Sequence, residues 1–285
     1  MESFINFLSN KLGITFLKHT PTSGGDISQA FIISAEKQEY FLKINSNFDA
    51  LAMFKAEQVG LDFIAQTQTI KTPKIIDCGK FEASAYLLLE YIPSKLPTDK
   101  DFEKLGRQLA SLHLKSQDKF GLGSNNFIGS LPQSNQKHKD WIIFYAKERL
   151  LPQFELAVKN NLLGDNEIPQ ELQIMETLYR FFGKVKPALL HGDLWSGNYL
   201  IATDGEPYLI DPAVYYGHNE VDIAMTKQFG GFPPAFYKAY HEVIPKTKHY
   251  ENCMKLYQLY YLLVHLNLFG SSYYNSVKQI VKNYF

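Results

Sequence analysis

The strongest constraint on the architecture lies in residues 191–212, where a polar loop leads into two apolar segments around Asp204-Gly205. Asp-Gly between apolar segments is a strong signal for a β-hairpin with a two-residue turn. A turn centred between these residues would pair Asn198 with Asp211 across the two strands. Opposite partners in an antiparallel pair have Cβ atoms ~4.5–5.5 Å apart. The sequence therefore predicts an amide oxygen beside a carboxylate, which are hard oxygen ligands suited to Mg²⁺.

A histidine and a second carboxylate precede Asn198 at a characteristic spacing. His191, Asp193 and Asn198 follow the pattern H-x-D-x-x-x-x-N of kinase-type catalytic loops. In those loops the Asp accepts the proton of the attacking hydroxyl group, while the Asn and a later Asp hold the metal ion. The alternative is a His-Gly turn followed by an unrelated hairpin. We favour the catalytic interpretation because the spacing, the turn and the second carboxylate, Asp211, agree independently.

The hydrophobic pattern changes at Pro93. Before it, the pattern predicts helices at 2–12 and 48–66 and strands at 29–34, 40–44, 74–77 and 86–92. After it, we expect a helix that follows a capping box at Thr98 and Asp101, a long loop at 118–137, and helices at 141–159, 169–182, 232–243 and 252–269. This order predicts an α+β fold in two lobes. Residues 1–92 would be a small antiparallel-sheet lobe that binds nucleotide, and residues 93–285 a mostly helical lobe with the catalytic loop and the acceptor site.

A phosphoryl donor requires a lysine, and Lys43 is the candidate. It lies near the end of the strand 40–44 inside an apolar run, where its charge needs a partner. Glu57 in the following helix can supply that ion pair, as happens between strand 3 and helix C of kinases. The alternative is a pair of solvated surface charges.

Two further segments are candidates for contacts with a nucleotide. Gly24 and Gly25 precede the strand 29–34 and would let backbone N–H groups approach phosphates, although most Gly-Gly pairs are only turns. Glu90, Tyr91 and Ile92 end the first lobe, where a hinge would offer main-chain groups to adenine.

Composition excludes several other classes of protein. The chain of 285 residues has 29 basic and 29 acidic residues, so it lacks the basic footprint of a nucleic-acid-binding protein. We expect no membrane span, because the apolar stretch at 256–269 is interrupted by polar residues. Two cysteines and an N-terminus without a basic signal region favour a cytoplasmic protein with free thiols.

Several stretches together resemble the fructosamine kinase/ketosamine 3-kinase family, whose protein-kinase-like fold is shared with aminoglycoside and choline kinases. Residues 191–198 carry the family motif HGDLWSGN, and residues 24–30 resemble its Gly-Gly nucleotide loop. Further matches are Asn126-Phe127-Ile128-Gly129, Pro132-Gln133, Asn135, Trp141 and residues 106–113 and 229–232. The resemblance covers essentially the whole chain.

The resemblance implies transfer of the γ-phosphate of ATP to the 3-hydroxyl group of ketosamines, which form when sugars glycate amines. By matching position it implies these roles: Asp193 as catalytic base, Asn198 and Asp211 as Mg²⁺ ligands, Lys43 on the ATP phosphates with Glu57 orienting it, and residues 90–92 as adenine hinge. The implied acceptors are small-molecule ketosamines or glycated lysines on proteins. Bacterial-type members are associated with ribulosamines and erythrulosamines more than with fructosamines. Because the 3-phosphates eliminate and free the amine, the implied role is protein deglycation.

One position departs from part of the family. Some eukaryotic members carry a cysteine after the Gly-Gly pair, linked to a redox-sensitive dimer, and this chain has Asp26 there. We therefore expect no such switch. The sequence leaves the preferred sugar and the oligomeric state open.

The spacing after Asp211 limits the size of the acceptor. Only residues 212–221 separate it from Asp222, too few for the activation loop and peptide platform of a protein kinase. We expect Asp222 to cap a helix and brace the catalytic loop. Two alternatives remain: a kinase of another small alcohol, of the aminoglycoside or choline type, and a non-catalytic nucleotide-binding module. The family-like segment 126–141 argues against the first, and the complete set of catalytic groups argues against the second.

Aromatic and histidine side chains in the second lobe receive structural interpretations. We expect His113 and His265 to be hydrogen-bonded core residues and His191 to orient the catalytic loop. Trp195 would either wall the acceptor site or pack against the protein. The tyrosines at 257, 260 and 261 are expected in the core.

Overall fold

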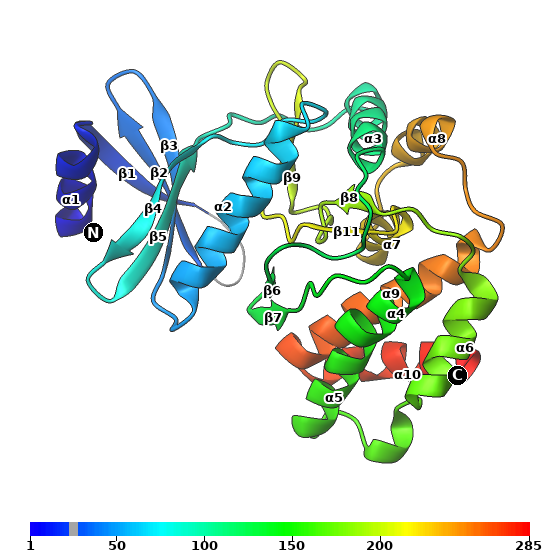
Figure 1. Cartoon of the computed structure of the whole chain (residues 1–285). Helices are drawn as coiled ribbons and strands as arrows, with labels where there is room; N and C mark the ends of the chain where they lie inside the picture. Colours follow the sequence, from blue (N-terminus) through cyan, green and yellow to red (C-terminus); the bar gives the residue numbers. More distant parts are fainter. Residues whose placement is uncertain (23–27) are drawn as a thin grey trace.

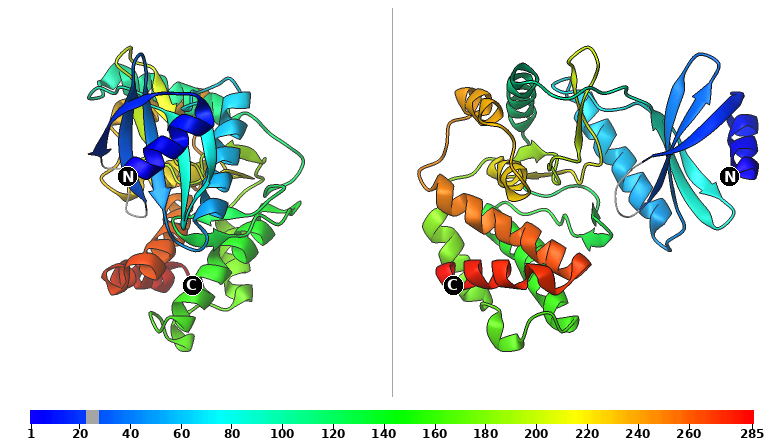
Figure 2. Two further views of the ribbon diagram at one scale, coloured as in Figure 1. Left: turned by 90° about the vertical axis from the view of Figure 1, so that its left-hand side faces the viewer. Right: turned by 180° about the vertical axis from the view of Figure 1, so that it is seen from behind.

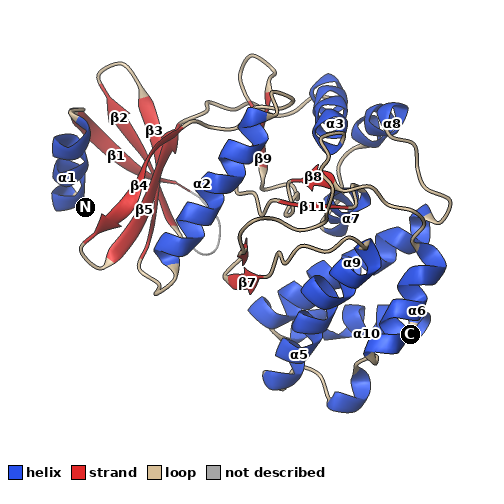
Figure 3. Cartoon of the chain, viewed as in Figure 1, coloured by secondary structure: helices blue, strands red, loops and turns tan. Residues whose placement is uncertain are grey.

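The computed structural model describes residues 1–22 and 28–285, and Figure 1 shows two parts that differ in their secondary structure. Within these residues, a five-stranded antiparallel sheet with two helices forms the N-terminal part, and helices dominate the rest (Figure 3). This arrangement confirms the predicted α+β two-lobe fold. The predicted nucleotide loop with Gly24, Gly25 and Asp26 lies outside the described residues.

The N-terminal sheet has the strand order β1-β2-β3-β5-β4. Its strands are β1 (Phe16–Thr22), β2 (Gln29–Ala35), β3 (Glu39–Asn45), β4 (Ile75–Phe81) and β5 (Ser84–Glu90). One face packs against α1 (Glu2–Leu12) and the other against α2 (Ala50–Gln66) (Figures 1 and 2). Side chains of β5 alternate between these faces, with Tyr86 and Leu88 toward α1 and Leu87 and Leu89 toward α2. Because both faces are covered, β5 has the continuous apolar sequence from which it was predicted.

The part of the chain after residue 98 is built mainly from helices. They are α3 (Asp99–His113), α4 (Trp141–Tyr145), α5 (Leu151–Lys159), α6 (Glu171–Phe181), α7 (Glu220–Gln228), α8 (Pro234–Val243), α9 (Tyr250–Phe269) and α10 (Tyr274–Tyr284). Short antiparallel strand pairs connect them: β6 (Asn126–Ile128) with β7 (Leu131–Gln133), β8 (Ala188–Leu190) with β11 (Tyr215–Gly217), and β9 (Tyr199–Ile201) with β10 (Pro207–Leu209).

Helix α9 forms the centre of the helical part. It packs against α5, α7 and α10, and most of its side chains are buried, as predicted for the helix at 252–269. A helix that is apolar on nearly all sides is stable only when other elements surround it. In the described residues, no helix is long and apolar enough to cross a membrane.

The register of the β9–β10 hairpin differs by one residue from the prediction. The structure pairs Leu200 with Tyr208, so Asn198 lies opposite Ile210 and not opposite Asp211. The N–H of Ile210 donates to the carbonyl oxygen of Asn198 at 3.1 Å.

The cause of this shift is the length of the turn. The N–H of Ala202 donates to the carbonyl oxygen of Glu206 at 2.9 Å, which encloses three residues instead of two. Gly205 has φ +83°, the left-handed conformation that completes a three-residue hairpin loop with a bulge. The extra residue in the loop moves every pair along the strands by one position.

Other differences concern the boundaries and number of helices. The loop expected at 118–137 contains the β6–β7 hairpin, and the helix expected at 141–159 is interrupted by a π-turn at Ala146–Leu150. Helix α10 was not predicted from the sequence, and of α7 only a beginning near Asp222 was expected. The expected capping box is confirmed, because the Thr98 hydroxyl accepts the N–H of Asp101 and the Asp101 carboxylate accepts the N–H of Thr98.

We predict that Asp101→Asn lowers the free energy of unfolding by about 1 kcal/mol at pH 7, the usual value of an N-terminal cap. Lys95 and Thr98 hydrogen-bond the Asp101 carboxylate and lower its pKa to about 2. A carboxyl group with a depressed pKa stabilises the fold above its unfolded pKa and loses that contribution as the pH falls toward the folded value. The difference from the unsubstituted protein should therefore shrink between pH 4 and pH 2.

Urea unfolding at a series of pH values measures this effect. Asp99→Asn is the matched control, because Asp99 is an exposed carboxylate in the same first turn. Equal unfolding curves for the two variants at every pH would contradict the role assigned to Asp101.

Candidate active site

The loop at 191–198 joins β8 to β9, and a carboxylate from α7 holds its beginning. Asp222, which is fully buried, accepts the N–H of His191 at 2.7 Å and the N–H of Gly192 at 2.9 Å. The expected bracing of the loop by Asp222 is therefore borne out. The expected capping is wrong: α7 begins at Glu220 after the N-cap residue Asn219, so Asp222 lies inside the first turn and its carboxylate reaches the loop instead of its own helix.

His191 connects the catalytic loop to the strand that leads to Asp211. Its Nε2 donates to the carbonyl oxygen of Ile210 at 2.9 Å, and its Nδ1 accepts the N–H of Asp193 at 3.2 Å. One neutral tautomer satisfies both bonds, and burial lowers the pKa of this imidazole. His191 therefore orients the loop, as predicted.

Gly192 adopts a conformation that other residues rarely take. Its φ is +87°, and a Cβ atom at this position would overlap the backbone carbonyl oxygen of Ala213. Its own carbonyl oxygen accepts the hydroxyl of Tyr261 at 3.0 Å. Glycine lets the loop pass this close to the segment after Asp211.

We predict that Gly192→Ala lowers the free energy of unfolding by about 1–3 kcal/mol, because a left-handed conformation and a backbone overlap are both unfavourable. The rate of phosphate transfer should fall by a larger factor than the fraction of folded protein, since any backbone shift that relieves the overlap also moves Asp193. Gly183→Ala is the control, because Gly183 has open space around it. Thermal unfolding and turnover measured on both variants test this, and a Gly192→Ala protein with the activity of the control would contradict it.

Asp193 and Asn198 interact directly within the loop. The side-chain nitrogen of Asn198 donates to Asp193 Oδ2 at 3.2 Å and to the Asp193 carbonyl oxygen at 2.9 Å. The amide oxygen of Asn198 is therefore the atom that can ligate a cation. Burial and the nearby charge of Asp222 raise the pKa of Asp193 to about 7, against a smaller opposing effect of the Asn198 bond. Such a proton affinity suits a general base near neutral pH.

Lys43 of β3 connects the sheet to the catalytic loop region. Its side chain is buried, and its Nζ lies 2.8 Å from Glu57 Oε1 of α2. The predicted ion pair is present, and the alternative of two solvated charges is wrong. The same Nζ also forms an ion pair with Asp211. The structure thus brings together three of the predicted site residues from both parts of the chain.

Asn198 and Asp211 line the same cavity although the register between them differs from the prediction. Asp211 has φ 53°, a left-handed conformation that Asp tolerates better than most residues. In the described residues, no group of three or more His, Cys, Asp or Glu side chains could hold a metal ion by itself. One carboxylate and one amide suit Mg²⁺, which commonly binds proteins through one or two carboxylates and keeps phosphate oxygens and water as its other ligands.

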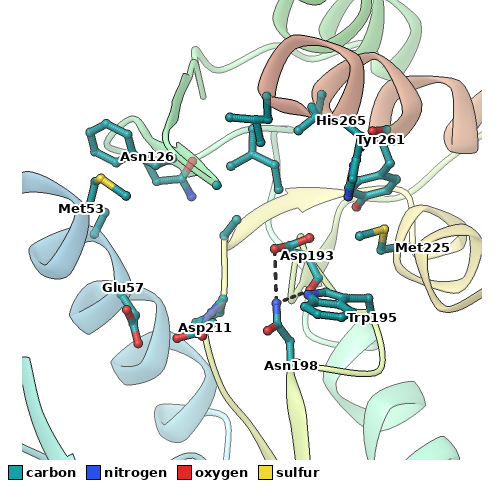
Figure 4. A pocket seen from close by; sticks show the side chains of 18 of the residues that line it. Met53, Glu57, Asn126, Asp193, Trp195, Asn198, Asp211, Met225, Tyr261 and His265 are labelled. Carbon is teal, nitrogen blue, oxygen red and sulfur yellow. Dashed lines mark hydrogen bonds between the residues drawn. The ribbon is translucent and has the colours of Figure 1, made fainter. Parts of the chain in front are cut away.

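A cavity of about 480 Å³ extends over this site (Figure 4). Figure 4 shows Asp193 and Asn198 between Glu57 of α2 on one side and Tyr261 of α9 on the other. Aromatic and apolar side chains dominate the end away from Lys43. They include Met225, Phe229, Tyr261, His265, Phe269 and Tyr273.

Trp195 and α9 contribute to this aromatic end. The indole of Trp195 is 36% exposed and lies directly over Gly197, where a side chain would collide with the ring. His265 donates from Nδ1 to the carbonyl oxygen of Tyr261 at 2.8 Å, and its ring lies 4.5 Å from that of Phe229. The expectation for His265 is confirmed in its hydrogen bond, but the side chain is only partly buried and lines the cavity. The spacing of Tyr261, His265 and Phe269 at intervals of four on one helix face was the signal that could have located this wall.

The three predicted hinge residues lie apart from the cavity. Glu90, Tyr91 and Ile92 are not among the described residues that line it. The N–H of Glu90 donates to the carbonyl oxygen of Lys74 at 2.8 Å, and that of Tyr91 to the carbonyl oxygen of Glu39 at 3.4 Å. The role of these three residues as an adenine hinge stays a prediction.

Sequence comparisons match the whole chain. The sequence model described as fructosamine kinase matches residues 1–285. Ketosamine-3-kinase of Mus musculus is 36% identical over 313 residues, covering 97% of this chain and 98% of the mouse protein. The chloroplastic protein-ribulosamine 3-kinase of Arabidopsis thaliana is 39% identical over 268 residues, covering 92% of this chain and 80% of the plant protein.

Solved structures agree with the sequence comparisons. A Haemophilus somnus protein that carries the name fructosamine-3-kinase superposes with a TM-score of 0.88 at 27% identity, covering 99% of this chain and 96% of the other. Aminoglycoside phosphotransferase APH(4)-Ia superposes with a TM-score of 0.66 at 17% identity, covering 99% and 98%, a likeness of fold alone. Variants of that phosphotransferase have been crystallised with ADP or AMP-PNP together with hygromycin B.

Proposed function

The chain belongs to the fructosamine kinase family, and we propose on this premise that it transfers the γ-phosphate of ATP to the 3-hydroxyl group of ketosamines. The single observation that carries this proposal is the meeting of Asp193 with Lys43 and Asp211 in one cavity. The names of the mouse and plant relatives support the acceptor class, since they are a ketosamine-3-kinase and a ribulosamine 3-kinase.

The proposed mechanism assigns separate tasks to the two ends of the cavity. Lys43, oriented by Glu57, would neutralise charge on the ATP phosphates, which would compete with Asp211 for this ammonium group. Asn198 and Asp211 would hold Mg²⁺, which supplies further neutralisation of phosphate charge when it is bound. Asp193 would accept the proton of the acceptor hydroxyl while holding that oxygen in line with the phosphate.

The lining of the acceptor end favours a ketosamine over an aminoglycoside. Among the described lining residues, the carboxylates are Glu57, Asp193 and Asp211, all at the phosphate end or in the catalytic loop. An aminoglycoside carries several ammonium groups, and we would expect carboxylates around them. A ketosamine carries one secondary ammonium group beside its sugar, which an aromatic wall can accommodate through cation–π contact.

The biological part of the proposal is deglycation in the cytoplasm. Ketosamine 3-phosphates eliminate and release the amine, so the reaction would free glycated lysines, with ribulosamines and erythrulosamines as the preferred adducts. The state of the cysteines supports a reducing compartment, since Cys78 and Cys253 are both free thiols.

The experiment is ADP release from Mg-ATP with a panel of acceptors: ribulosyl-lysine, erythrulosyl-lysine, fructosyl-lysine, choline and kanamycin. We expect turnover with the ketosamines, fastest with the first two, and none with choline or kanamycin. Turnover with choline or kanamycin alone would overturn the acceptor class. Nucleotide binding without turnover on any acceptor would instead favour a non-catalytic nucleotide-binding module.

A further inference from the structure

A buried chain of hydrogen bonds leads away from the carboxylate that braces the catalytic loop. Asp222 Oδ2 lies 3.0 Å from Nε2 of His113, the last residue of α3, and His113 Nδ1 lies 2.7 Å from the hydroxyl of Tyr240 in α8. The side-chain nitrogen of Asn219 donates to that same hydroxyl at 2.9 Å. The side chains of His113 and Asp222 are 0% exposed. Helices α3 and α8 lie side by side in Figures 1 and 2, and the hydrogen-bonded side chains lie between these two helices and α7.

The direction of the bond between His113 and Asp222 follows from the chemistry of the two side chains. A carboxylate only accepts hydrogen bonds, so His113 must carry a proton on Nε2. The Tyr240 oxygen accepts the N–H of Asn219 and also lies within hydrogen-bond distance of His113 Nδ1. Consecutive hydrogen bonds therefore join Asn219, Tyr240, His113 and Asp222, and His113 donates the last of them from Nε2.

Within the described part of the chain, the carboxylate of Asp222 accepts three hydrogen bonds. Two come from the N–H groups of His191 and Gly192 in the catalytic loop, and the third comes from His113. Burial alone would raise the pKa of Asp222, yet the bond from His113 and the other neighbours lower it on balance. Without His113, one side of a buried carboxylate would lose its partner, which is costly unless the carboxylate turns toward another donor. Such a rotation of the carboxylate would either break its hydrogen bonds with the N–H groups of His191 and Gly192 or shift these two residues, which directly precede Asp193.

We propose that His113 is a positioning residue for phosphate transfer, because its Nε2–H holds Asp222 in the orientation that fixes His191 and Gly192 and so places Asp193. This assignment rests on the proposed role of Asp193 as the base. The proposed role of His113 differs from packing. The fold needs a side chain of this size at position 113, whereas the reaction needs a hydrogen-bond donor at the position of Nε2. His113 is not among the described residues that line the cavity, and it acts only through Asp222.

A matched pair of substitutions separates the donor from the packing. His113→Gln and His113→Met introduce side chains of similar length, and only glutamine has an N–H donor near the position of Nε2. We expect kcat of the Met variant to fall about 10- to 100-fold, the loss typical when an orienting partner is removed. The KM values for ATP and for ribulosyl-lysine should stay within about threefold. The Gln variant should recover most of the lost kcat.

The controls use the neighbouring histidine and a readout that does not depend on turnover. His241 also makes two hydrogen bonds, to the Ile244 carbonyl and the Tyr250 hydroxyl, so His241→Gln and His241→Met should both retain the kcat of the unsubstituted protein. Amide hydrogen exchange at residues 191–193 reports on the loop directly. It should accelerate about tenfold in the His113→Met variant and stay slow in the His113→Gln variant.

Each outcome decides the question. Equal losses of kcat in the Gln and Met variants, matching their losses of stability, would reduce His113 to a packing residue and overturn the proposal. Full activity in both would also overturn it. If the Met variant does not fold, His113→Asn replaces it, because an asparagine nitrogen reaches only the position of Nδ1. If the unsubstituted protein turns over no ketosamine, the proposed function fails, while hydrogen exchange still decides whether His113 holds the loop.

Discussion

Asp193→Asn should lower kcat for phosphate transfer by roughly 10²–10⁴-fold, the usual contribution of a general base. Asparagine has nearly the shape of aspartate and can still contact Asn198, so the loop should keep its conformation. It cannot accept the proton of the attacking hydroxyl group at neutral pH. The affinity for ATP should therefore stay within about threefold, because the lost interaction belongs to the transition state.

The measurement combines steady-state kinetics with an independent ATP titration. Asp204→Asn is the matched control, since it makes the same chemical change at an exposed turn of the adjoining hairpin. An Asp193→Asn protein with the turnover of this control would remove Asp193 from the reaction. A large loss of ATP affinity would mean that Asp193 acts mainly at the nucleotide.

The second large effect is expected for Asp211→Asn, and it should differ from that of Asp193→Asn in its dependence on Mg²⁺. Asparagine tolerates the left-handed conformation at this position, so the backbone should be preserved where alanine would be strained. The substitution removes the only carboxylate among the two proposed Mg²⁺ ligands and one of the two carboxylate partners of Lys43. We expect turnover to fall about 10²-fold or more, in line with several kcal/mol of charge stabilisation by a bound metal.

The dependence on Mg²⁺ distinguishes the two variants. Titration of Mg²⁺ at fixed ATP should show a higher half-saturating concentration for Asp211→Asn and an unchanged one for Asp193→Asn. If Asp211→Asn retained the Mg²⁺ dependence of the unsubstituted protein, Asp211 would not be a metal ligand.

Local patterns were enough to predict much of this structure. The capping box at Thr98, the apolar run of β5 and the helix pattern of α2 depend on neighbours within a few residues, and each is present. The ion pair of Lys43 with Glu57 was also predictable, because a buried lysine near the end of a strand is followed directly by a helix that carries a carboxylate.

The hairpin register was not predictable in the same way. Asp204-Gly205 permits both a two-residue turn and a three-residue loop with Gly205 in the left-handed conformation. The choice depends on how the strands continue into the catalytic loop and into Asp211. The error is one residue, and it leaves both Asn198 and Asp211 at the cavity.

Long-range polar contacts were outside the reach of sequence reasoning. His113 and Asp222 are 109 residues apart in the chain, and no local pattern links them. The tyrosines of α9 were predicted as core, and Tyr257, Tyr260 and Tyr261 are indeed buried. Tyr261 nevertheless also lines the cavity and donates to Gly192, a double role that only the packing of α9 against the loop reveals.

The position of the transferred phosphate is the most direct test of the central proposal. The protein would be incubated with Mg-ATP and ribulosyl-lysine, and the product would be examined by ³¹P and ¹³C NMR as it forms. We predict phosphate on O3 of the sugar, followed by release of free lysine as the phosphate eliminates. Phosphate on another oxygen, or ADP formed without any phosphorylated sugar, would contradict the account.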